Sequence, residues 1–376
     1  MKIIAKTLMG LEDVLAKEIR NLGVENIDIA KRAIVYEGNP ELLYKSNLYL
    51  RSALRILVGI DDFTAKNEDE LYENAKNIDW KNYLGLNQTF AIDTNVNSDI
   101  FTHSKYVAYK VKDAIADYYS EKYGRRPNVN TYEPDVKINV RIFKNNVEIS
   151  LDSSGESLHR RGYKVEVLEA PLSEVLAAGI LLNTDFESKS SFLDPMCGSG
   201  TFVTEALMIN TNMAPNLLRE KFGFMNWQNY ERRMWIDMKE KAKEQIKEPT
   251  IDFNAYDISR KAVFATKKNL SLLQYGDHVN VIKKDFFKLK DCKNIDFVIM
   301  NPPYDMRLKE DEIISFYQGI GDKLKQDCAP CEAWVFSGNI EALKRLGLRP
   351  SKKTKMMNGK IEAELRKFEV NPRKEN

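Results

Sequence analysis

The sequence predicts an α/β protein of two or three domains, in which an open, mostly parallel sheet follows an α+β region. Three observations predict this fold class. A chain of 376 residues is too long for one compact core. After residue 190, short apolar runs alternate with helical patterns, and polar residues follow each run. Asn358-Gly359, between residues 354–357 and 361–370, predicts a tight hairpin that adds an antiparallel strand.

The first run of the sheet, residues 191–193, leads into a glycine-bearing loop that suits a small anionic ligand. Gly198 and Gly200 remove side chains that would keep a ligand from the backbone, and they permit positive φ. The helix that starts at Thr201 presents free N–H groups to a carboxylate or phosphate. The spacing lacks the third glycine of the dinucleotide fingerprint, so we predict no nicotinamide site.

Two later strand ends carry an aspartate each. Asp257, followed by Ile258, ends the run 251–256, where a carboxylate can accept both ribose hydroxyls of a nucleoside. Asp285 follows the run 279–284 and can accept an adenine amino group, while Phe286 can lie against the ring. A single aspartate of this kind is more often a helix cap or a solvated loop residue. Their recurrence at successive strand ends favours one ligand site at the edge of the sheet.

The apolar run 297–300 ends in a tetrapeptide that suits chemistry on the amino group of a flat base. The Asn301 side-chain oxygen and the Pro302 carbonyl can accept both N–H hydrogens of such an amine and turn its lone pair out of the ring plane. Pro303 keeps the turn rigid, and Tyr304 can stack on the base. An ordinary turn after a strand is the alternative for this motif alone.

The order DPMCGSGT, YDIS, DFF and NPPY resembles class I S-adenosylmethionine-dependent methyltransferases of the amino-group type. More closely, the chain is similar to THUMP-containing RNA guanine-N2 methyltransferases, namely the bacterial large-subunit rRNA enzymes and their tRNA relatives. Residues 157–163, 170–174, 337–339 and 358–362 resemble further segments of that family. The resemblance implies a Rossmann-like, seven-stranded, mostly parallel sheet with an antiparallel hairpin strand near its end.

The resemblance also implies the roles of the motif residues. The target base is then held by Asn301, Pro302, Pro303 and Tyr304. S-adenosylmethionine is then held by Asp194, Pro195, Met196, Cys197, Gly198, Ser199, Gly200, Thr201, Asp257, Ile258, Asp285 and Phe286.

The amino-terminal part is predicted to form two small α/β arrangements. Strands are predicted at residues 1–7, 33–37, 53–63, 89–96, 136–143 and 147–151, and helices over 11–22, 41–50, 71–78 and 102–122. The last two strands are predicted to meet in a hairpin at Asn145-Asn146. This arrangement resembles a ferredoxin-like unit joined to a THUMP domain. The predicted domains are residues 1–58, ferredoxin-like; 59–160, THUMP; and 161–376, methyltransferase.

Local charge is more informative than the net charge of +2. Basic residues and tyrosines interleave on the predicted helix 102–122 and just beyond it, and basic side chains can neutralise phosphates while tyrosines stack on bases. A solvated helix with half-buried tyrosines is the alternative. The residues predicted to bind RNA are Lys105, Lys112, Arg125, Arg126, Arg160 and Arg161.

Composition excludes several classes of protein. No apolar run reaches the length of a membrane helix and no secretory signal is seen, so we expect a cytoplasmic protein without a membrane partner. The four cysteines are not expected to form a disulfide framework. Cys328 and Cys331 have the spacing of a redox or half-zinc motif, but the chain has three histidines and no metal is predicted. Cys197 is expected to pack beside the cofactor and not to act as a nucleophile.

We therefore predict an RNA methyltransferase that flips a base out of its stack and methylates its exocyclic amine, most favourably guanine N2 of 23S rRNA. Alternatives are a guanine-N2 methyltransferase of tRNA, or an amino methyltransferase of DNA adenine or protein glutamine. A non-enzymatic RNA-binding protein is the least favoured. The sequence leaves open which nucleotide is modified, whether naked RNA or a ribosomal precursor is bound, and the oligomeric state.

Overall fold

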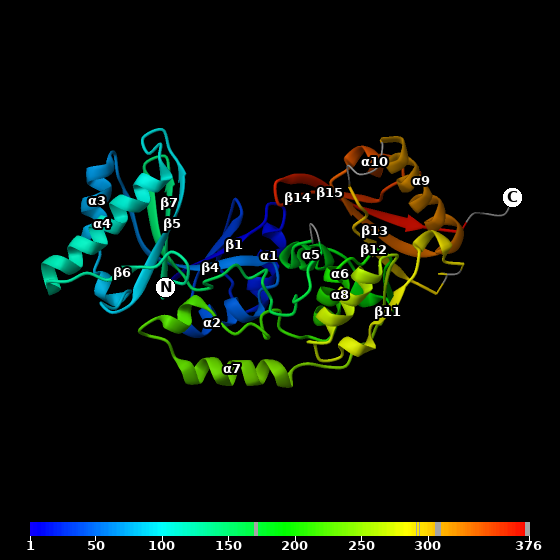
Figure 1. Cartoon of the computed structure of the whole chain (residues 1–376), viewed down its shortest axis with the longest axis horizontal. Helices are drawn as coiled ribbons and strands as arrows, with labels where there is room; N and C mark the ends of the chain where they lie inside the picture. The colour runs from blue at the N-terminus through cyan, green and yellow to red at the C-terminus, as the bar shows by residue number, and fades with distance from the viewer. Residues whose placement is uncertain (169–171, 291, 293, 305–309, 373–376) are drawn as a thin grey trace. The chain divides into compact units, whose positions relative to one another are not determined.

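The computed structural model describes residues 1–168, 172–290, 292, 294–304 and 310–372 (Figure 1). Ala170 and Pro171 of the predicted junction lie outside these residues. Over the described part, the chain forms two compact units. Unit 1 comprises Met1–Thr7, Glu18–Leu158 and Arg219–Lys239, and unit 2 comprises Leu8–Lys17, His159–Leu218 and Glu240–Asn376.

Unit 1 is built on a sheet with the order β2-β3-β1-β4-β8-β7-β5-β6 among the residues described. Its central strand β4 is twelve residues long, so that its first half pairs with β1 and its second half with β8. One continuous strand therefore belongs to both predicted amino-terminal arrangements. The strands are β1 (Lys2–Thr7), β2 (Ile27–Ala30), β3 (Ala33–Glu37), β4 (Ala53–Thr64), β5 (Thr89–Asn97), β6 (Asn128–Val129), β7 (Val136–Phe143) and β8 (Asn146–Asp152).

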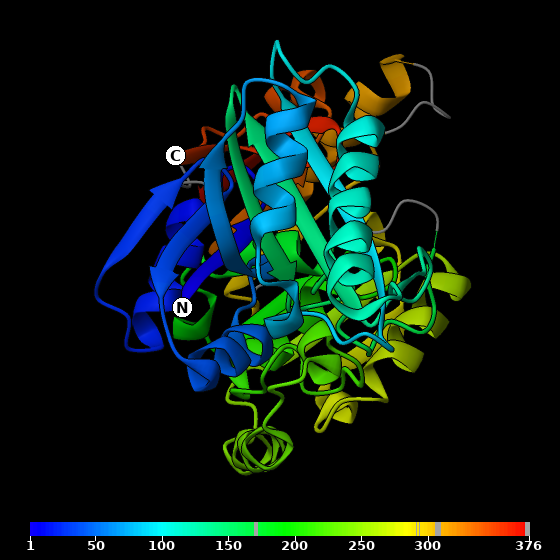
Figure 2. The same cartoon turned by 90° about the vertical axis from the view of Figure 1, so that its left-hand side faces the viewer.

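Helices α3 (Glu68–Asn77) and α4 (Ser104–Tyr123) lie side by side across one half of this sheet (Figure 2). Helix α4 buries Val107, Val111 and Ala114, which recur at helical spacing, against a core that includes Trp80. The other helical segments of the amino-terminal part are α1 (Glu12–Asn21), α2 (Pro40–Tyr49) and the 3-10 turn η1 (Trp80–Asn82).

Unit 2 contains the predicted seven-stranded sheet, with the order β11-β10-β9-β12-β13-β15-β14 within the described residues. Pairing is parallel from β11 to β13, whereas β15 is antiparallel to both β13 and β14. The mostly parallel sheet with an antiparallel hairpin is thereby confirmed. The strands are β9 (Ser191–Asp194), β10 (Asp252–Asp257), β11 (Asn280–Lys283), β12 (Phe297–Met300), β13 (Cys331–Ser337), β14 (Lys352–Asn358) and β15 (Ile361–Val370).

Helices cover both faces of the unit 2 sheet, with α5, α6 and α8 on one face and α9 and α10 on the other (Figure 1). Parallel strands buried on both faces read as continuous apolar runs, and β12 is buried at each position. On one face Val298 and Met300 pack against α9, and on the other Phe192 stacks on Phe297. These helices are α5 (Glu174–Leu181), α6 (Thr201–Asn210), α8 (Arg260–Leu270), α9 (Glu310–Asp327) and α10 (Ile340–Lys344). Helix α7 (Arg232–Glu244) has residues in both units.

Both predicted hairpins form, but each loop lies one residue away from its predicted position. In the carboxy-terminal hairpin Asn358 pairs with Ile361, so the two loop residues are Gly359 and Lys360. Gly359 has φ +63°, whereas Asn358 is the last residue of β14 and has no positive φ. Glycine at the first loop position is typical of a type II′ turn. The prediction that Asn358 supplies a turn residue is therefore wrong, and its side chain has a different role, described below.

The pairing of the cysteines differs from the one that the spacing of Cys328 and Cys331 suggests. Cys292 is joined to Cys328 by a disulfide, so these two cysteines are not free thiols. Cys331, predicted to share a motif with Cys328, is a buried thiol at the start of β13. No group of three or more metal-ligating side chains, and no helix long and apolar enough to cross a membrane, occurs in the part of the chain that the structure describes.

Candidate functional site

The glycine loop runs from the end of β9 to the start of α6 and is held by main-chain bonds. The Cys197 N–H donates to the Tyr256 carbonyl at 2.9 Å, and the Gly198 N–H donates to Asp257 Oδ2 at 3.0 Å. Gly198 and Gly200 have φ +56° and +82°, which confirms the predicted positive φ. A Cβ on Gly198 would face open space, so the backbone is accessible at this point of the loop.

Two residues of α8 that the sequence reasoning missed hold the same loop from behind. Thr266 Oγ1 donates to the Gly198 carbonyl at 3.0 Å, and Asn269 Nδ2 donates to the Ser199 carbonyl at 3.0 Å. Both side chains are fully buried, and a Cβ on Gly200 would lie only 2.7 Å from Thr266 Cγ2. Thr266 and Asn269 are three residues apart on an otherwise amphipathic helix, so two polar groups on its buried face were the available signal.

Burial raises the pKa of two groups that line the loop. Asp194 at the end of β9 is 2% exposed, and burial raises the pKa of its carboxyl well above the ordinary value. Its Oδ1 accepts a hydrogen bond from the Met196 N–H at 3.3 Å. Burial likewise raises the pKa of the Cys197 thiol well above its ordinary value. A neutral buried thiol is a poor nucleophile, which agrees with the packing role expected for Cys197.

Asp257 joins the ends of two neighbouring strands. Its Oδ1 accepts from the Ser259 N–H at 2.8 Å, while Oδ2 accepts from the Gly198 N–H. These bonds fix the carboxylate at the point where β10 meets the glycine loop, and each oxygen keeps a second lone pair. The next residue, Ile258, is 66% exposed. An apolar side chain exposed beside a carboxylate is a surface on which a flat ring can lie.

The third strand end corrects a predicted contact. Asp285 Oδ1 caps the 3-10 turn Phe286–Lys288 by accepting from the Phe287 N–H at 3.0 Å. Phe286, predicted to lie against a ring, is only 3% exposed and belongs to the hydrophobic core that also contains Tyr317. Phe287 is 38% exposed. The 3-10 turn directs the first phenylalanine inward and the second outward, so Phe287 replaces Phe286 as the candidate ring contact.

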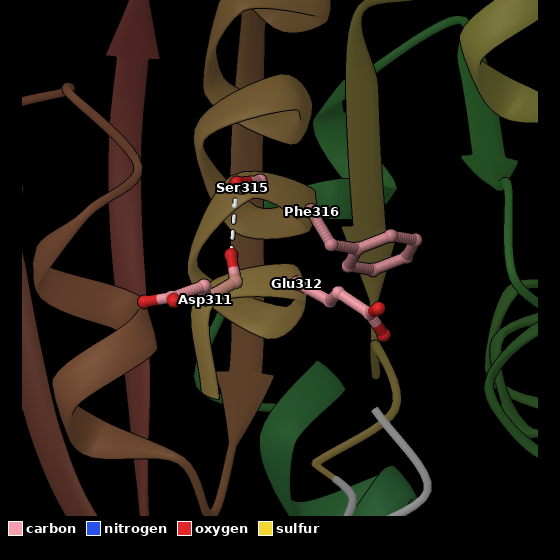
Figure 3. A pocket seen from close by; sticks show the side chains of 4 residues that line it. All are labelled: Asp311, Glu312, Ser315 and Phe316. Atoms are coloured by element: carbon pink, nitrogen blue, oxygen red, sulfur yellow. Dashed lines mark hydrogen bonds between the residues drawn. The ribbon is translucent and has the colours of Figure 1, made fainter. Parts of the chain in front are cut away.

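Phe287 also contacts the wall of an open pocket of about 510 Å³ over the first turns of α9. Asp311, Glu312, Ser315 and Phe316 line this pocket, and Ser315 Oγ donates to the Asp311 carbonyl at 2.8 Å (Figure 3). The Phe316 ring meets Phe287 edge to face, with ring centres 5.2 Å apart. An aromatic surface therefore extends from the end of β11 to α9.

The fourth strand end carries the predicted amide and aromatic pair. Asn301 follows β12 directly, and the Tyr304 hydroxyl donates to Asn301 Oδ1 at 2.5 Å. Burial raises the pKa of the Tyr304 hydroxyl above its ordinary value, so it remains a donor at neutral pH. Pro303 is exposed, and its carbonyl accepts from the Tyr317 hydroxyl at 3.3 Å. Tyr304 is therefore bound to Asn301 through its hydroxyl, in addition to presenting a ring.

The strand order brings these four ends to the same edge. β9 lies between β10 and β12, and all three run parallel, so their carboxyl ends lie together. From β9, the chain continues to β10 and β11 on one side and then to β12 and β13 on the other. Such a reversal of strand order is where open α/β sheets bind ligands.

The residues predicted to bind RNA divide into exposed and buried groups. Arg161 is 0% exposed and lies 3.4 Å from Glu205, also 0% exposed, so its prediction as an RNA contact is wrong. Its guanidinium compensates a buried carboxylate and cannot reach a phosphate. On α4, Tyr118 and Tyr119 are buried, whereas Tyr106 and Tyr109 are exposed. The remaining predicted side chains are exposed or partly exposed: Lys105, Lys112, Arg125, Arg126 and Arg160.

Family models match most of the chain. Residues 161–367 match the model described as "RMKL-like, methyltransferase domain", which covers more than half of the sequence. The chain belongs to the RMKL-like methyltransferase family. Residues 65–152 match the THUMP domain, and residues 2–57 match the RlmL ferredoxin-like domain. The resemblance predicted from the motifs is thereby confirmed.

Named relatives of this RMKL-like chain are similar over nearly all of its length. It is 34% identical over 382 residues to a ribosomal RNA large subunit methyltransferase K/L of Syntrophotalea carbinolica, covering 98% of this chain and 54% of that protein. The chain thus spans about half the length of the curated relatives of that name. It is also 35% identical to a Synechocystis sp. protein named RNA methyltransferase slr0064, covering 97% of this chain and 96% of that one.

Solved structures agree with this assignment. The structure of SMU.472, a methyltransferase complexed with SAH, superposes with TM-score 0.87 and 28% identity, covering 100% of this chain and 99% of that one. A protein from Listeria monocytogenes, named a predicted N6-adenine-specific DNA methylase, superposes with TM-score 0.86 and 27% identity over 99% of this chain and 96% of that one. The class I methyltransferase fold with an amino-terminal ferredoxin-like and THUMP region is therefore established.

Proposed function

We propose that this chain transfers a methyl group from S-adenosylmethionine to the exocyclic amine of an RNA base, namely guanine N2 of 23S rRNA. One observation carries the proposal. The glycine loop after β9 and the carboxylate at the end of β10 are hydrogen-bonded to each other, and the Asn301 amide follows the adjacent strand β12. The proposed cofactor site and the proposed amine-binding site are thus at neighbouring strand ends, an arrangement that supports a direct transfer.

The residues present fit S-adenosylmethionine. The accessible backbone at Gly198 and the free N–H groups at the start of α6 suit the amino-acid part of the cofactor. Asp257 would accept the ribose hydroxyls, and Ile258 and Phe287 would contact the adenine ring. Asp285 would accept the adenine amino group. The remaining motif residues that we propose for this site are Asp194, Pro195, Met196, Cys197, Ser199, Gly200 and Thr201.

The base side would activate the amine. When bound, the cofactor would supply an electrophilic methyl group; its transfer to the amine nitrogen would release S-adenosylhomocysteine, and the nitrogen would lose one proton to solvent. Asn301 Oδ1 and the Pro302 carbonyl would accept the two amine hydrogens, which favours the out-of-plane lone pair that this attack requires. The Tyr304 ring would lie on the base. Because these groups act only on the reacting amine, they raise turnover more than they raise substrate affinity.

The amino-terminal part would recognise the RNA. The exposed face of α4 carries Lys105, Tyr106, Tyr109 and Lys112, a combination of phosphate-neutralising and base-stacking side chains. We propose Arg125, Arg126 and Arg160 as further contacts with the RNA. We also propose that the ferredoxin-like domain ends at residue 58 and the THUMP domain at residue 160. A ribosomal RNA substrate would place the enzyme in the cytoplasm.

The name of the Listeria structure favours a second candidate amine, adenine N6. The two candidates are separated by nucleoside mass spectrometry of total RNA and DNA from cells with and without this protein. The proposal predicts loss of one N2-methylguanosine from 23S rRNA and its return when the gene is restored. Unchanged rRNA together with loss of N6-methyladenine from DNA would contradict it and support the second candidate.

A further inference from the structure

The tip of the carboxy-terminal hairpin reaches the proposed amine-binding residues. Asn358, the last residue of β14, is partly buried, and its Nδ2 lies 3.4 Å from the Tyr304 hydroxyl oxygen. Asn358 is 54 residues away from Tyr304 in the chain. The one-residue displacement of the turn places Asn358 in β14, where the strand sets the direction of its side chain.

Three side chains form a chain of hydrogen bonds with one polarity. Asn358 Nδ2 donates to the Tyr304 hydroxyl, and that hydroxyl donates to Asn301 Oδ1 at 2.5 Å. A tyrosine hydroxyl has a single hydrogen, so it can donate to one of its two amide neighbours and must accept from the other. Donation by Asn358 therefore directs the hydrogen of Tyr304 toward Asn301.

Neighbouring residues keep Tyr304 in this arrangement. Asn339 Nδ2 donates to the Tyr304 carbonyl at 3.5 Å. A Cβ on Gly338 would lie 3.1 Å from the Tyr304 ring and 2.8 Å from Ile361 Cγ2, so the absence of a side chain there lets the ring and the hairpin approach each other. Ile361 is the cross-strand partner of Asn358. The hairpin and the tyrosine thus pack against each other as well as sharing a hydrogen bond.

We propose that Asn358 is a positioning residue for the methyl transfer, which acts through Tyr304 to orient the Asn301 amide. This inference rests on the proposed function, because it assigns Asn301 to the reacting amine. An amide presents an oxygen that accepts and a nitrogen that donates, and only the oxygen can accept an amine hydrogen. A donor fixed at Tyr304 holds the oxygen in place and leaves its second lone pair for the base.

The Asn358→Asp variant tests the polarity of the chain, because a carboxylate accepts and does not donate. The Tyr304 hydrogen would turn toward residue 358, and Asn301 would lose its donor. We expect kcat on RNA to fall about 100-fold for Asn358→Asp and about tenfold for Asn358→Ala, with KM within about twofold. A residue that only fills space would give the opposite order, since Asp has the shape of Asn.

The pH dependence provides a readout that a packing role would not produce. A protonated aspartic acid can donate again, so kcat of Asn358→Asp relative to wild type should rise as the pH falls from about 8 to about 5. Asn358→Ala should show no such recovery. The matched control is Asn280→Asp, the same chemical change at an exposed asparagine of β11 that bonds to Asn254 and should leave kcat unchanged.

A measurement without catalysis separates this inference from the proposed function. In spectra of protein labelled with ¹⁵N at asparagine side chains, Asn358→Asp should shift the Asn301 amide signals, and Asn280→Asp should not. The role of Asn358 is overturned if the Asn301 amide signals do not shift in Asn358→Asp. It is also overturned if Asn358→Asp and Asn358→Ala lose equal amounts of kcat at all pH values. If the wild-type protein is inactive on RNA but Asn358→Asp still shifts the Asn301 amide signals, the proposed substrate is overturned and the hydrogen-bond chain is supported.

Discussion

The cofactor side and the base side of the proposed site are stabilised in different ways. On the cofactor side, the glycine loop is held by backbone groups bonded to Asp257, Thr266 and Asn269. On the base side, Asn301 is joined to Tyr304, and Tyr304 to Asn358, by hydrogen bonds between side chains. A main chain held at several points has little freedom before a ligand binds. Side chains that depend on one another can be disturbed by a single substitution.

The difference has a functional meaning. The cofactor is the same in every turnover, so a preformed loop costs little in adaptability and lowers the entropy lost on binding. In the proposed reaction, the base would be flipped from RNA and would then meet an amide in one orientation, which a relay of donors can specify. We therefore expect substitutions on the two sides to separate cofactor affinity from turnover.

The largest effect is expected on the base side. Asn301→Ala removes the acceptor for the amine and should lower kcat about 1,000-fold. Affinity for S-adenosylhomocysteine should stay within about twofold, because the glycine loop does not contact Asn301 through any bond that the structure describes. Single-turnover methyl transfer and calorimetry measure the two quantities. Retained turnover would remove Asn301 from the chemistry, and lost cofactor affinity would show that the two sides are not separable.

The complementary substitution is Asp257→Ala on the cofactor side. It removes both the expected ribose contact and the acceptor for the Gly198 N–H, so the Kd for S-adenosylmethionine should rise about 10- to 100-fold. With saturating cofactor, kcat should change much less. Calorimetry against the Asp252→Ala control, an exposed aspartate at the other end of β10, tests this expectation. Wild-type affinity in Asp257→Ala would argue against the ribose assignment.

A smaller effect is expected for the exposed basic residues of α4. Replacing Lys105 and Lys112 together by Ala should weaken RNA binding about tenfold and reduce the slope of log K against log salt by about 1 to 2. Arg161→Ala is the contrasting variant, because it leaves Glu205 buried without its cation and should lower the free energy of unfolding by about 3–5 kcal/mol. Filter binding at several salt concentrations and denaturant unfolding distinguish the two. An unchanged salt slope in the double variant would remove α4 from the RNA surface.

The smallest effect concerns pH. Burial raises the pKa of Tyr304 above its ordinary value and that of Tyr317 to about 12, so both hydroxyls stay protonated well above neutral pH. Because a raised pKa extends the protonated range upward, kcat should be nearly constant between about pH 7 and pH 9. A pH–rate profile measured at saturating substrate checks this. A fall in kcat centred near pH 9 would show that a hydroxyl in the site ionises within that range.

The comparison of the two sides also explains how much could be predicted from the sequence. The strand ends and the glycine loop were predictable, because Gly198, Asp257 and Asn301 lie in short motifs whose spacing reflects local backbone geometry. The ring contact predicted for Phe286 was wrong. The 3-10 turn that points Phe286 inward cannot be recognised from the alternation of apolar and polar residues along the sequence. Asn358 was assigned to a turn because Asn-Gly favours one. Its contact with Tyr304 depends on tertiary packing across 54 residues, which periodicity does not encode.

The basic residues illustrate the same limit. Arg160 and Arg161 are adjacent and chemically identical, yet one is exposed and the other is paired with Glu205 in the interior. The partner is 44 residues away, so no local pattern distinguishes the two arginines. Similarly, Cys292 and Cys328 are joined across 36 residues, whereas the nearer cysteine of the Cys-x-x-Cys spacing is not involved.

A crystal structure with S-adenosylhomocysteine bound would test the central claim most directly, that adjacent strand ends form one site for the cofactor and the target amine. We predict ribose hydroxyls on Asp257, the adenine ring between Ile258 and Phe287, and the sulfur atom directed toward the Asn301 amide. A cofactor bound away from Gly198 and Asp257, or a sulfur atom directed away from Asn301, would contradict the account.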